Sequence, residues 1–264
     1  MKVKNLATFF HSMDQYLGYL DAARTLLALG MLGYAGVVDM RTREVHDLLW
    51  VVAGASALLL DAYELLLGSL SLYQLAVAVG FMGVVGLALW FFRLMGEADV
   101  FAFFVLALIH PKAPVYLGAL WGWSPVFFPF TMLSNTAVAG IVAPLITALG
   151  NVTVKLRGVD LFERARGLSG PRRIVLLFTA RYVRLAGVRG PPFQYPLEGA
   201  GELSLRPDLW DDGAAQKTFM ELRSRGYKWT WVSATLPYIV VMAAGYLLSV
   251  IFGDVIFWIL FTVL

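Results

Sequence analysis

The stretch LYQLAVAVGFMGVVGLALWFF, residues 72–92, runs for 21 residues without a charged side chain. A helix of about 20 mostly apolar residues is the length needed to cross a hydrocarbon core of about 30 Å. Over the whole chain 59% of residues are hydrophobic and only 15% are charged, which is more apolar surface than a soluble protein of 264 residues can bury. The sequence therefore predicts an all-α polytopic membrane protein, with Leu72–Phe92 as its third span.

Further apolar segments lie on both sides of this span, and together they predict about six transmembrane helices. The other full-length candidates are Ala22–Val38, Asp47–Leu67, Pro129–Leu149 and Trp229–Ile251.

The fourth helix, Asp99–His110, reaches only about 18 Å and is too short to cross the membrane unaided. We expect Pro111–Pro125 to form an outer loop after it. The first residues, Met1–Leu20, predict a short amphipathic segment at the interface rather than a signal peptide.

A small cytoplasmic subdomain is predicted between spans five and six, so the chain divides into residues 1–150, 151–228 and 229–264. Asn151–Lys228 carries 14 basic and 8 acidic residues. This excess favours contact with lipid headgroups over nucleic acid, since no nucleic-acid motif accompanies it. Within the segment we expect helices at Val154–Arg166, Arg172–Val188 and Ala214–Arg225, and a loop or small hairpin at Phe193–Pro207.

The basic residues also orient the chain, because cytoplasmic loops of membrane proteins are enriched in Lys and Arg. Arg41 and Arg43 follow the first span, and Asn151–Lys228 holds 14 of the 21 basic residues, whereas the outer loops hold only Lys112. The prediction is a multi-pass protein of the cell membrane with both termini outside.

This orientation places two aspartates at the cytoplasmic edge of the membrane. Asp39 closes the first span and Asp99 opens the short fourth helix. Carboxylates are costly near hydrocarbon, so each indicates a functional site, although a helix cap or a solvated interface residue is the simpler explanation for either one alone. Two neighbouring carboxylates that share one proton can act as acid and base in amide hydrolysis.

The division of roles between the two carboxylates stays open at this point. The helix macrodipole favours the anion of Asp99 at a helix start and opposes that of Asp39 at a helix end. Arg41 and Arg43, however, favour the anion of Asp39.

The residues around the two aspartates resemble those of the archaeal prepilin and preflagellin (archaellin) peptidases, which are GxGD-type membrane aspartyl proteases. In that family an aspartate closes the first span and is followed by a basic residue and a short polar turn. Asp39, Arg43 and the turn Glu44–Asp47 fit this pattern. The family's usual asparagine is absent from the turn, and Asp47 lies near its place.

The second family motif, Gly-x-Gly-Asp, is matched by Gly96, Glu97, Ala98 and Asp99, with Ala98 in place of the second glycine. Small residues before Asp99 allow a tight turn and a close approach of a substrate backbone. The resemblance covers about half of the chain. It implies Asp39 and Asp99 as the catalytic pair.

The resemblance also implies the reaction, which is removal of a short basic leader from pilin-like or archaellin precursors at the cytoplasmic face. Glu44, Asp47 and Glu97 are candidates to bind the basic leader, with ordinary solvated loop carboxylates as the alternative. No cofactor is implied. The chain has no cysteine, which excludes Cys-based zinc sites and the Cys-x-x-Cys domain of bacterial relatives, and its histidines lack metal-ligand spacing.

Two other functions compete with this one. A small ion-coupled transporter or channel could use Asp39 and Asp99 as ion ligands, but it predicts midplane sites and an inverted repeat. A presenilin-like protease carries a Pro-Ala-Leu motif, which does not occur here. Asp61 and Glu64 share a face of the second span. We expect both side chains to be solvated near the outer interface, and the alternative is that they line an ion pathway.

Overall fold

The structure is a computed structural model that describes residues 2–92, 94–121, 124–199, 202–205, 208–209, 211–234 and 236–263. The chain forms two compact units. One comprises Met1–Ala139 and Pro237–Leu264, and the other comprises Gly140–Leu236.

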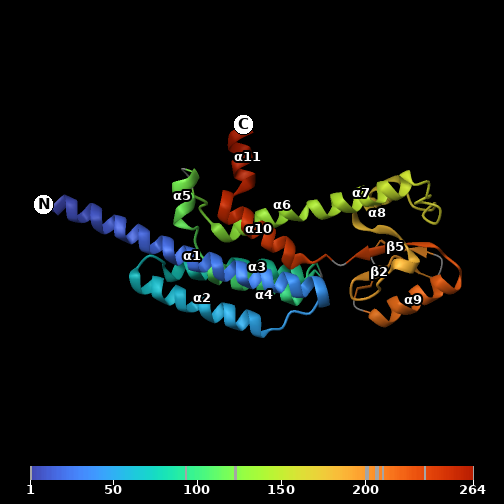
Figure 1. Ribbon diagram of the computed structural model, residues 1–264, viewed down its shortest axis with the longest axis horizontal. Coiled ribbons are helices and arrows are strands. Elements are labelled where there is room, and N and C mark those ends of the chain that lie inside the picture. The colour runs from blue at the N-terminus through green and yellow to red at the C-terminus, as the bar shows by residue number, and fades with distance from the viewer. Residues whose placement is uncertain are drawn as a thin grey trace. The chain divides into compact units, whose positions relative to one another are not determined.

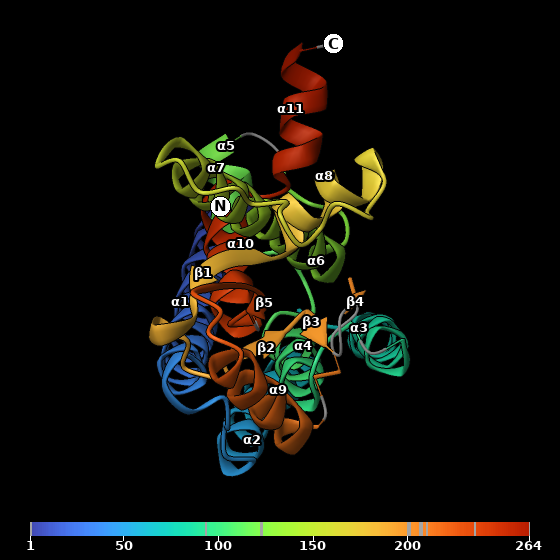
Figure 2. The same ribbon diagram turned by 90° about the vertical axis from the view of Figure 1, so that its right-hand side faces the viewer.

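Helices are the regular elements among the described residues of the first unit. Its helices are α1 (Lys2–Thr42), α2 (Leu48–Leu67), α3 (Leu72–Phe91), α4 (Glu97–Ile109), α5 (Val115–Trp121), α6 (Phe128–Gly140), α10 (Tyr238–Phe252) and α11 (Val255–Val263). The short α4 lies at the centre of the unit, between α1, α2 and α3 (Figures 1 and 2). Seven of its 13 residues are buried, including Phe103, Leu106 and Ile109. The helix carrying Asp99 is therefore fixed by packing along its length.

Four helical segments are long and apolar enough to cross a membrane: Tyr16–Thr42, Leu48–Leu67, Leu72–Phe91 and Phe128–Leu156. The second and third match the predicted spans closely, and the fourth joins α6 to α7. The protein is a mostly helical polytopic membrane protein, but the predicted count of six is not confirmed. α4 and α10 are apolar but have only 13 and 15 residues.

Other details of the span prediction were wrong. The segment Met1–Leu20 is not separate, because α1 runs unbroken from Lys2 to Thr42. The expected outer loop Pro111–Pro125 contains α5, while Gly122 and Trp123 lie outside the described residues. The predicted span Trp229–Ile251 is divided into a strand, β5 (Trp229–Ala234), and α10.

The second unit combines helices with two small sheets. Its elements are α7 (Val142–Leu156), α8 (Gly170–Thr179), β1 (Arg181–Arg184), the 3-10 turn η1 (Leu185–Gly187), β2 (Gln194–Pro196), β3 (Glu198–Gly199), β4 (Glu202–Leu203), α9 (Asp212–Ser224) and β5. β5 is the central strand of an antiparallel sheet of order β1-β5-β2, with Tyr182 opposite Trp231 and Tyr195 opposite Ser233. β3 and β4 pair as a two-stranded hairpin.

Successive residues of β5 point to opposite faces of the sheet, and each face has its own core. Trp231 is fully buried against Leu161 and Leu176, and its Nε1–H donates to the Leu161 carbonyl at 3.1 Å. Val232 packs on the other face against Phe219 and Leu222 of α9. Because β5 completes both cores, it serves as a strand instead of beginning the last span.

The secondary-structure predictions for this segment had mixed outcomes. Ala214–Arg225 is confirmed as α9, which Asp211 caps by accepting from the Ala214 N–H at 2.8 Å. The prediction of a helix at Val154–Arg166 was wrong, because α7 ends at Leu156 and Gly158 has φ 82°. Arg172–Val188 is helical only to Thr179, since its second half pairs with β5. The expected loop or hairpin Phe193–Pro207 contains β2, β3 and β4, with Arg206 and Pro207 outside the described residues.

A buried ion cluster joins α1, α2 and the end of α4. The Arg24 guanidinium contacts Asp61 at 2.8 Å and Glu64 at 3.1 Å, and it donates to the Ile109 carbonyl at 2.7 Å. Lys112 Nζ lies 2.5 Å from Glu64. Asp61 and Glu64 are 1% and 0% exposed, so the prediction that they are solvated was wrong: two basic side chains compensate their charge.

Candidate active site

Asp39 is positioned by the end of α1. The Arg43 backbone N–H donates to the Asp39 carbonyl at 3.1 Å, and Arg43 then adopts φ 62°, in the left-handed region that ends a helix. The Arg43 guanidinium folds back to lie 3.5 Å from Asp39 Oδ2. Only 14% of the Asp39 side chain is exposed, so this arginine is a large part of the carboxylate's surroundings.

Asp99 is positioned by the first turn of α4. Its Oδ2 accepts a hydrogen bond from the Gly96 backbone N–H at 3.0 Å, which closes the turn that begins the helix. Burial raises the pKa of Asp99 to about 6, and the hydrogen bond from Gly96 opposes that rise. The Asp99 carboxyl group therefore keeps its proton to a higher pH than a solvent-exposed aspartate, although it lies at a helix start.

The charges at the two helix ends act on each other. The Asp39 carboxylate raises the pKa of Asp99 further, and the Arg43 guanidinium lowers it. The end of α1 and the start of α4 therefore share one electrostatic environment, although 60 residues separate the two aspartates in sequence.

Two glycines allow the helices that carry the aspartates to pack closely. A Cβ added to Gly86 on α3 would lie 3.2 Å from a methyl of Val100, the residue after Asp99. A Cβ added to Gly36, one turn before Asp39, would lie 3.3 Å from Val240 on α10. Larger residues at these positions would displace the helix ends that hold the carboxylates.

The predicted small-residue turn before Asp99 has a different physical basis from the one expected. Gly96 has φ −80°, which any residue adopts, and an added Cβ would be in ordinary contact 3.7 Å from Asp99 Oδ2. The backbone therefore does not require glycine here. Ala98 packs against the helical core, whereas Glu97 is exposed.

The two acidic residues of the turn between α1 and α2 face solvent. Glu44 and Asp47 are both exposed. Asp47 precedes α2, yet its side chain makes no capping hydrogen bond there; the His46 Nδ1 instead accepts from the Leu48 N–H at 3.1 Å. A helix-capping role therefore does not account for Asp47.

Sequence reasoning missed Tyr238, the first residue of α10. Its ring lies 6.3 Å from that of Phe103 on α4, and its hydroxyl is within electrostatic range of Asp99. The predicted span Trp229–Ile251 had placed Tyr238 inside a continuous helix. Pro237 was the available signal, since proline is common at the start of a helix.

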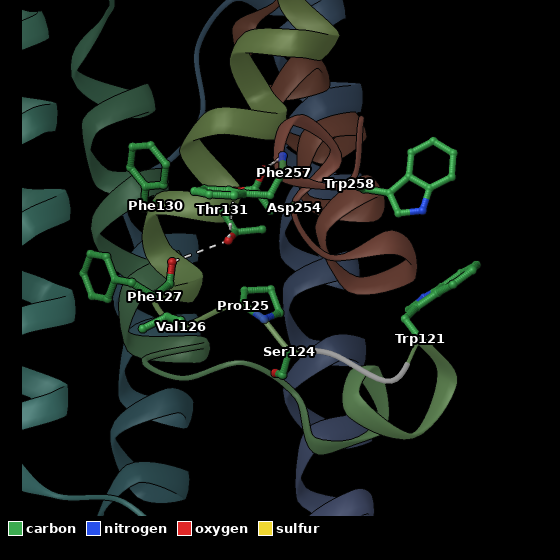
Figure 3. A pocket seen from close by; sticks show the side chains of 10 residues that line it. All are labelled: Trp121, Ser124, Pro125, Val126, Phe127, Phe130, Thr131, Asp254, Phe257 and Trp258. Atoms are coloured by element: carbon green, nitrogen blue, oxygen red, sulfur yellow. Dashed lines mark hydrogen bonds between the residues drawn. The ribbon is translucent and has the colours of Figure 1, made fainter. Parts of the chain in front are cut away.

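A cavity of about 820 Å³ lies elsewhere in the first unit (Figure 3). Apolar and aromatic side chains from α5, α6, α11 and the loop before α6 dominate its lining, among them Trp121, Phe130 and Trp258. Asp254 contributes its carboxylate there but caps α11, accepting from the Phe257 N–H at 3.0 Å. Neither Asp39 nor Asp99 lines this cavity, so it is separate from the carboxylate pair.

Metal-ligating side chains do not cluster in the part of the chain that the structure describes: no group of three or more His, Cys, Asp or Glu residues is suitably placed.

Comparison with curated proteins finds two preflagellin peptidases. One, from Methanocaldococcus jannaschii, is 25% identical over 233 residues, covering 86% of this chain and 92% of the relative. The other, from Methanococcus voltae, is 22% identical over 239 residues, covering 86% of this chain and 94% of the relative. No protein-family model matches the chain.

Proposed function

From the similarity to these relatives, which supports a preflagellin/prepilin peptidase-like family, we propose that the chain is a membrane aspartic endopeptidase that removes leader peptides. Its proposed substrates are archaellin or pilin-like precursors, and its proposed catalytic residues are Asp39 and Asp99. The observation that carries this proposal is that Asp39, in the last turn of α1, and Asp99, in the first turn of α4, lie on helices in contact with each other, with the Asp39 charge acting on Asp99.

The surroundings of the carboxylates support a division of their roles. Asp99, with its pKa raised to about 6, is the residue that keeps the shared proton, and Asp39, beside Arg43, is the ionised base. The opposing macrodipole effect is worth up to about 2 kcal/mol at a partly buried position, which is less than the free-energy equivalent of the rise in the Asp99 pKa from 3.8 to about 6. Burial therefore outweighs the helix dipole at Asp99.

The proposed reaction follows from these roles. Asp39 takes a proton from water, and the hydroxide character that develops attacks the scissile carbonyl. Asp99 donates its proton through Oδ1 to the carbonyl oxygen, because the Gly96 N–H already occupies Oδ2. As the amide breaks, the proton that Asp39 took passes to the leaving amine. Asp99 regains its proton from a hydroxyl group of the tetrahedral intermediate as the new carbonyl forms, so the carboxylate pair returns to its initial state.

The proposed active site faces the cytoplasm. Arg41 and Arg43 follow α1, and the segment Asn151–Lys228 carries 14 of the 21 basic residues, a distribution that supports this orientation. A basic leader held in the cytoplasm would then meet the exposed carboxylates of Glu44, Asp47 and Glu97, which we propose as its binding residues.

The transporter alternative predicts carboxylates near the membrane midplane. Asp39 instead lies in the last turn of α1 and Asp99 in the first turn of α4. These positions favour the peptidase.

The direct test uses the full chain in membranes with an archaellin-like precursor that bears a basic leader. Wild type should release the leader, whereas Asp39→Asn and Asp99→Asn should each lower the rate by at least a hundredfold, because each removes one member of the acid–base pair. Asp160→Asn is the matched control, since an asparagine oxygen can still accept from the Phe162 N–H. Equal cleavage by all four proteins would exclude the proposed pair.

A further inference from the structure

Helix α8 presents an apolar face that the described part of its own unit leaves uncovered. Leu176 is fully buried in the core beneath it, whereas Ile174, Val175 and Phe178 are 59%, 48% and 39% exposed. The spacing i, i+1, i+4 places these three side chains on one face of the helix. A ten-residue helix that exposes three large apolar side chains is typical of an interfacial segment.

The same helix is tied to the end of a candidate membrane span. The Asn151 amide of α7 donates to the carbonyls of Leu177 at 2.8 Å and Ala180 at 2.6 Å, at the end of α8. Its oxygen accepts from the Tyr182 N–H at 2.9 Å. Asn151 is 1% exposed, so these bonds are part of the packed core of the unit.

α7 itself forms the second half of the fourth candidate span, Phe128–Leu156. Its exposed side chains include Leu145, Leu149 and Val152, which recur along one side of the helix. α8 packs directly against α7 at the end of this candidate span, so its exposed apolar face adjoins the point where the span would leave the membrane.

Basic residues surround α8. Residues 155–184 hold eight Lys or Arg and only two acidic residues. Arg172 is exposed in the first turn of α8, and Arg181 is exposed just after its end. An apolar face bordered by positive charge is complementary to a leaflet of anionic phospholipid, in which each basic residue near the surface contributes to attraction.

We propose that α8 lies in the headgroup–acyl boundary of the cytoplasmic leaflet and binds anionic phospholipid there. Ile174, Val175 and Phe178 insert among the acyl chains, while Arg172 and Arg181 contact the phosphates. This inference does not rest on the proposed peptidase activity, since it uses contacts within the second unit and the candidate span that contains α7.

The absence of cysteine from the chain makes the test direct, because a single introduced cysteine is a unique labelling position. In the variants Ile174→Cys and Phe178→Cys, the introduced cysteine on α8 is labelled with a nitroxide. Met220→Cys on α9 is the matched control, since Met220 is also apolar and 55% exposed, on a helix outside the proposed patch. Each full-length variant is reconstituted into vesicles of mixed neutral and anionic phospholipid.

The measurement compares the collision of each nitroxide with oxygen, which concentrates in lipid, and with a water-soluble nickel complex. We expect labels at 174 and 178 to be accessible to oxygen and shielded from nickel, and the label at 220 to show the reverse. Nickel accessibility at 174 and 178 equal to that at 220 would overturn the proposal. Shielding from both reagents, or spin–spin broadening between chains, would overturn it in favour of a protein partner.

Charge reversal tests the lipid specificity. Arg172→Glu should cause a loss of nickel shielding at position 178 in anionic vesicles, and the loss should shrink in vesicles of neutral lipid or at high salt. Arg225→Glu, an exposed arginine at the end of α9, should leave the shielding unchanged. Equal effects of the two charge reversals would contradict a phosphate contact at Arg172. Unchanged oxygen and nickel accessibility of the label at position 220 would confirm that the unit stays folded.

Discussion

At the scale of single residues, Asp39 and Asp99 differ in what compensates their charge. Asp39 has a guanidinium 3.5 Å away, and Asp99 has one backbone N–H and a more buried position. The sequence identified both residues by motif and by their place at the ends of apolar segments. It could not predict their roles, because burial of Asp99 depends on how α4 packs against helices distant in sequence.

The raised pKa of Asp99 predicts the pH dependence of cleavage. Asp99 must hold a proton to act as the acid, so the rate should fall as pH rises through about 6. Leader release measured from pH 4.5 to 8 checks this expectation. A cleavage rate that is constant over that range would show that a group other than Asp99 acts as the acid.

The raised pKa of Asp99 also makes the stability of the folded protein depend on pH. A carboxyl whose pKa is about 6 when folded and 3.8 when unfolded binds more protons in the native state, so the free energy of unfolding should decrease between about pH 4 and 6 and then level off. Asp99→Asn should remove this part of the pH dependence. Thermal unfolding of both proteins at pH 4, 5, 6 and 7 measures the difference.

Arg43 should control the pH at which activity is lost. Its charge lowers the pKa of Asp99, so Arg43→Gln should move the falling limb of the pH profile to higher pH. Arg41→Gln is the control, since Arg41 is exposed and does not shift Asp99. A limb that moves equally in both variants would indicate a general effect of net charge.

At the scale of elements, the contact between α3 and α4 should set the position of Asp99. Gly86→Ala places a methyl 3.2 Å from Val100 and should cost about 1–3 kcal/mol by overpacking, with a lower cleavage rate. Gly83→Ala on the same helix is the control, since its nearest atom is 3.9 Å away. Adding Val100→Ala to Gly86→Ala should restore much of the loss, and failure to do so would contradict this contact.

The ion cluster should be the most sensitive polar element of the first unit. Arg24→Ala leaves Asp61 and Glu64 buried without their main partner and should destabilise the protein by about 3–5 kcal/mol. Lys112→Ala should cost less, because the Lys112 side chain is 20% exposed and Glu64 keeps its contact with Arg24. Thermal unfolding in detergent ranks the two, and the opposite order would contradict the roles assigned to them.

The outcome of the sequence predictions differed between elements for physical reasons. α2 and α3 were predicted almost to the residue, because lipid-facing helices are apolar over a fixed length. β5 was missed because its apolar run, with Trp229, Trp231 and Val232, continues into α10 with no charged residue between Lys228 and Asp254. The ion cluster was missed because its partners Arg24 and Lys112 come from helices or loops that only the tertiary packing brings to Asp61 and Glu64.

At the scale of the whole molecule, the chain separates a helical unit that carries both aspartates from a mixed unit rich in arginine. Composition and charge predict a division at residues 1–150, 151–228 and 229–264, which stays a prediction. The boundaries lie at Gly140 and Pro237, within the fourth candidate span and just after β5, where no change in composition marks them.

The strand order β1-β5-β2 also has a consequence for synthesis of the chain. β1 and β2 do not pair with each other, so both wait for β5, which is made after 228 of the 264 residues. Domains generally fold as units while the chain leaves the ribosome. The arginine-rich unit therefore closes only after residues 229–234 have been made, and a chain that stops before Trp229 would leave two strand edges unpaired and open to proteolysis.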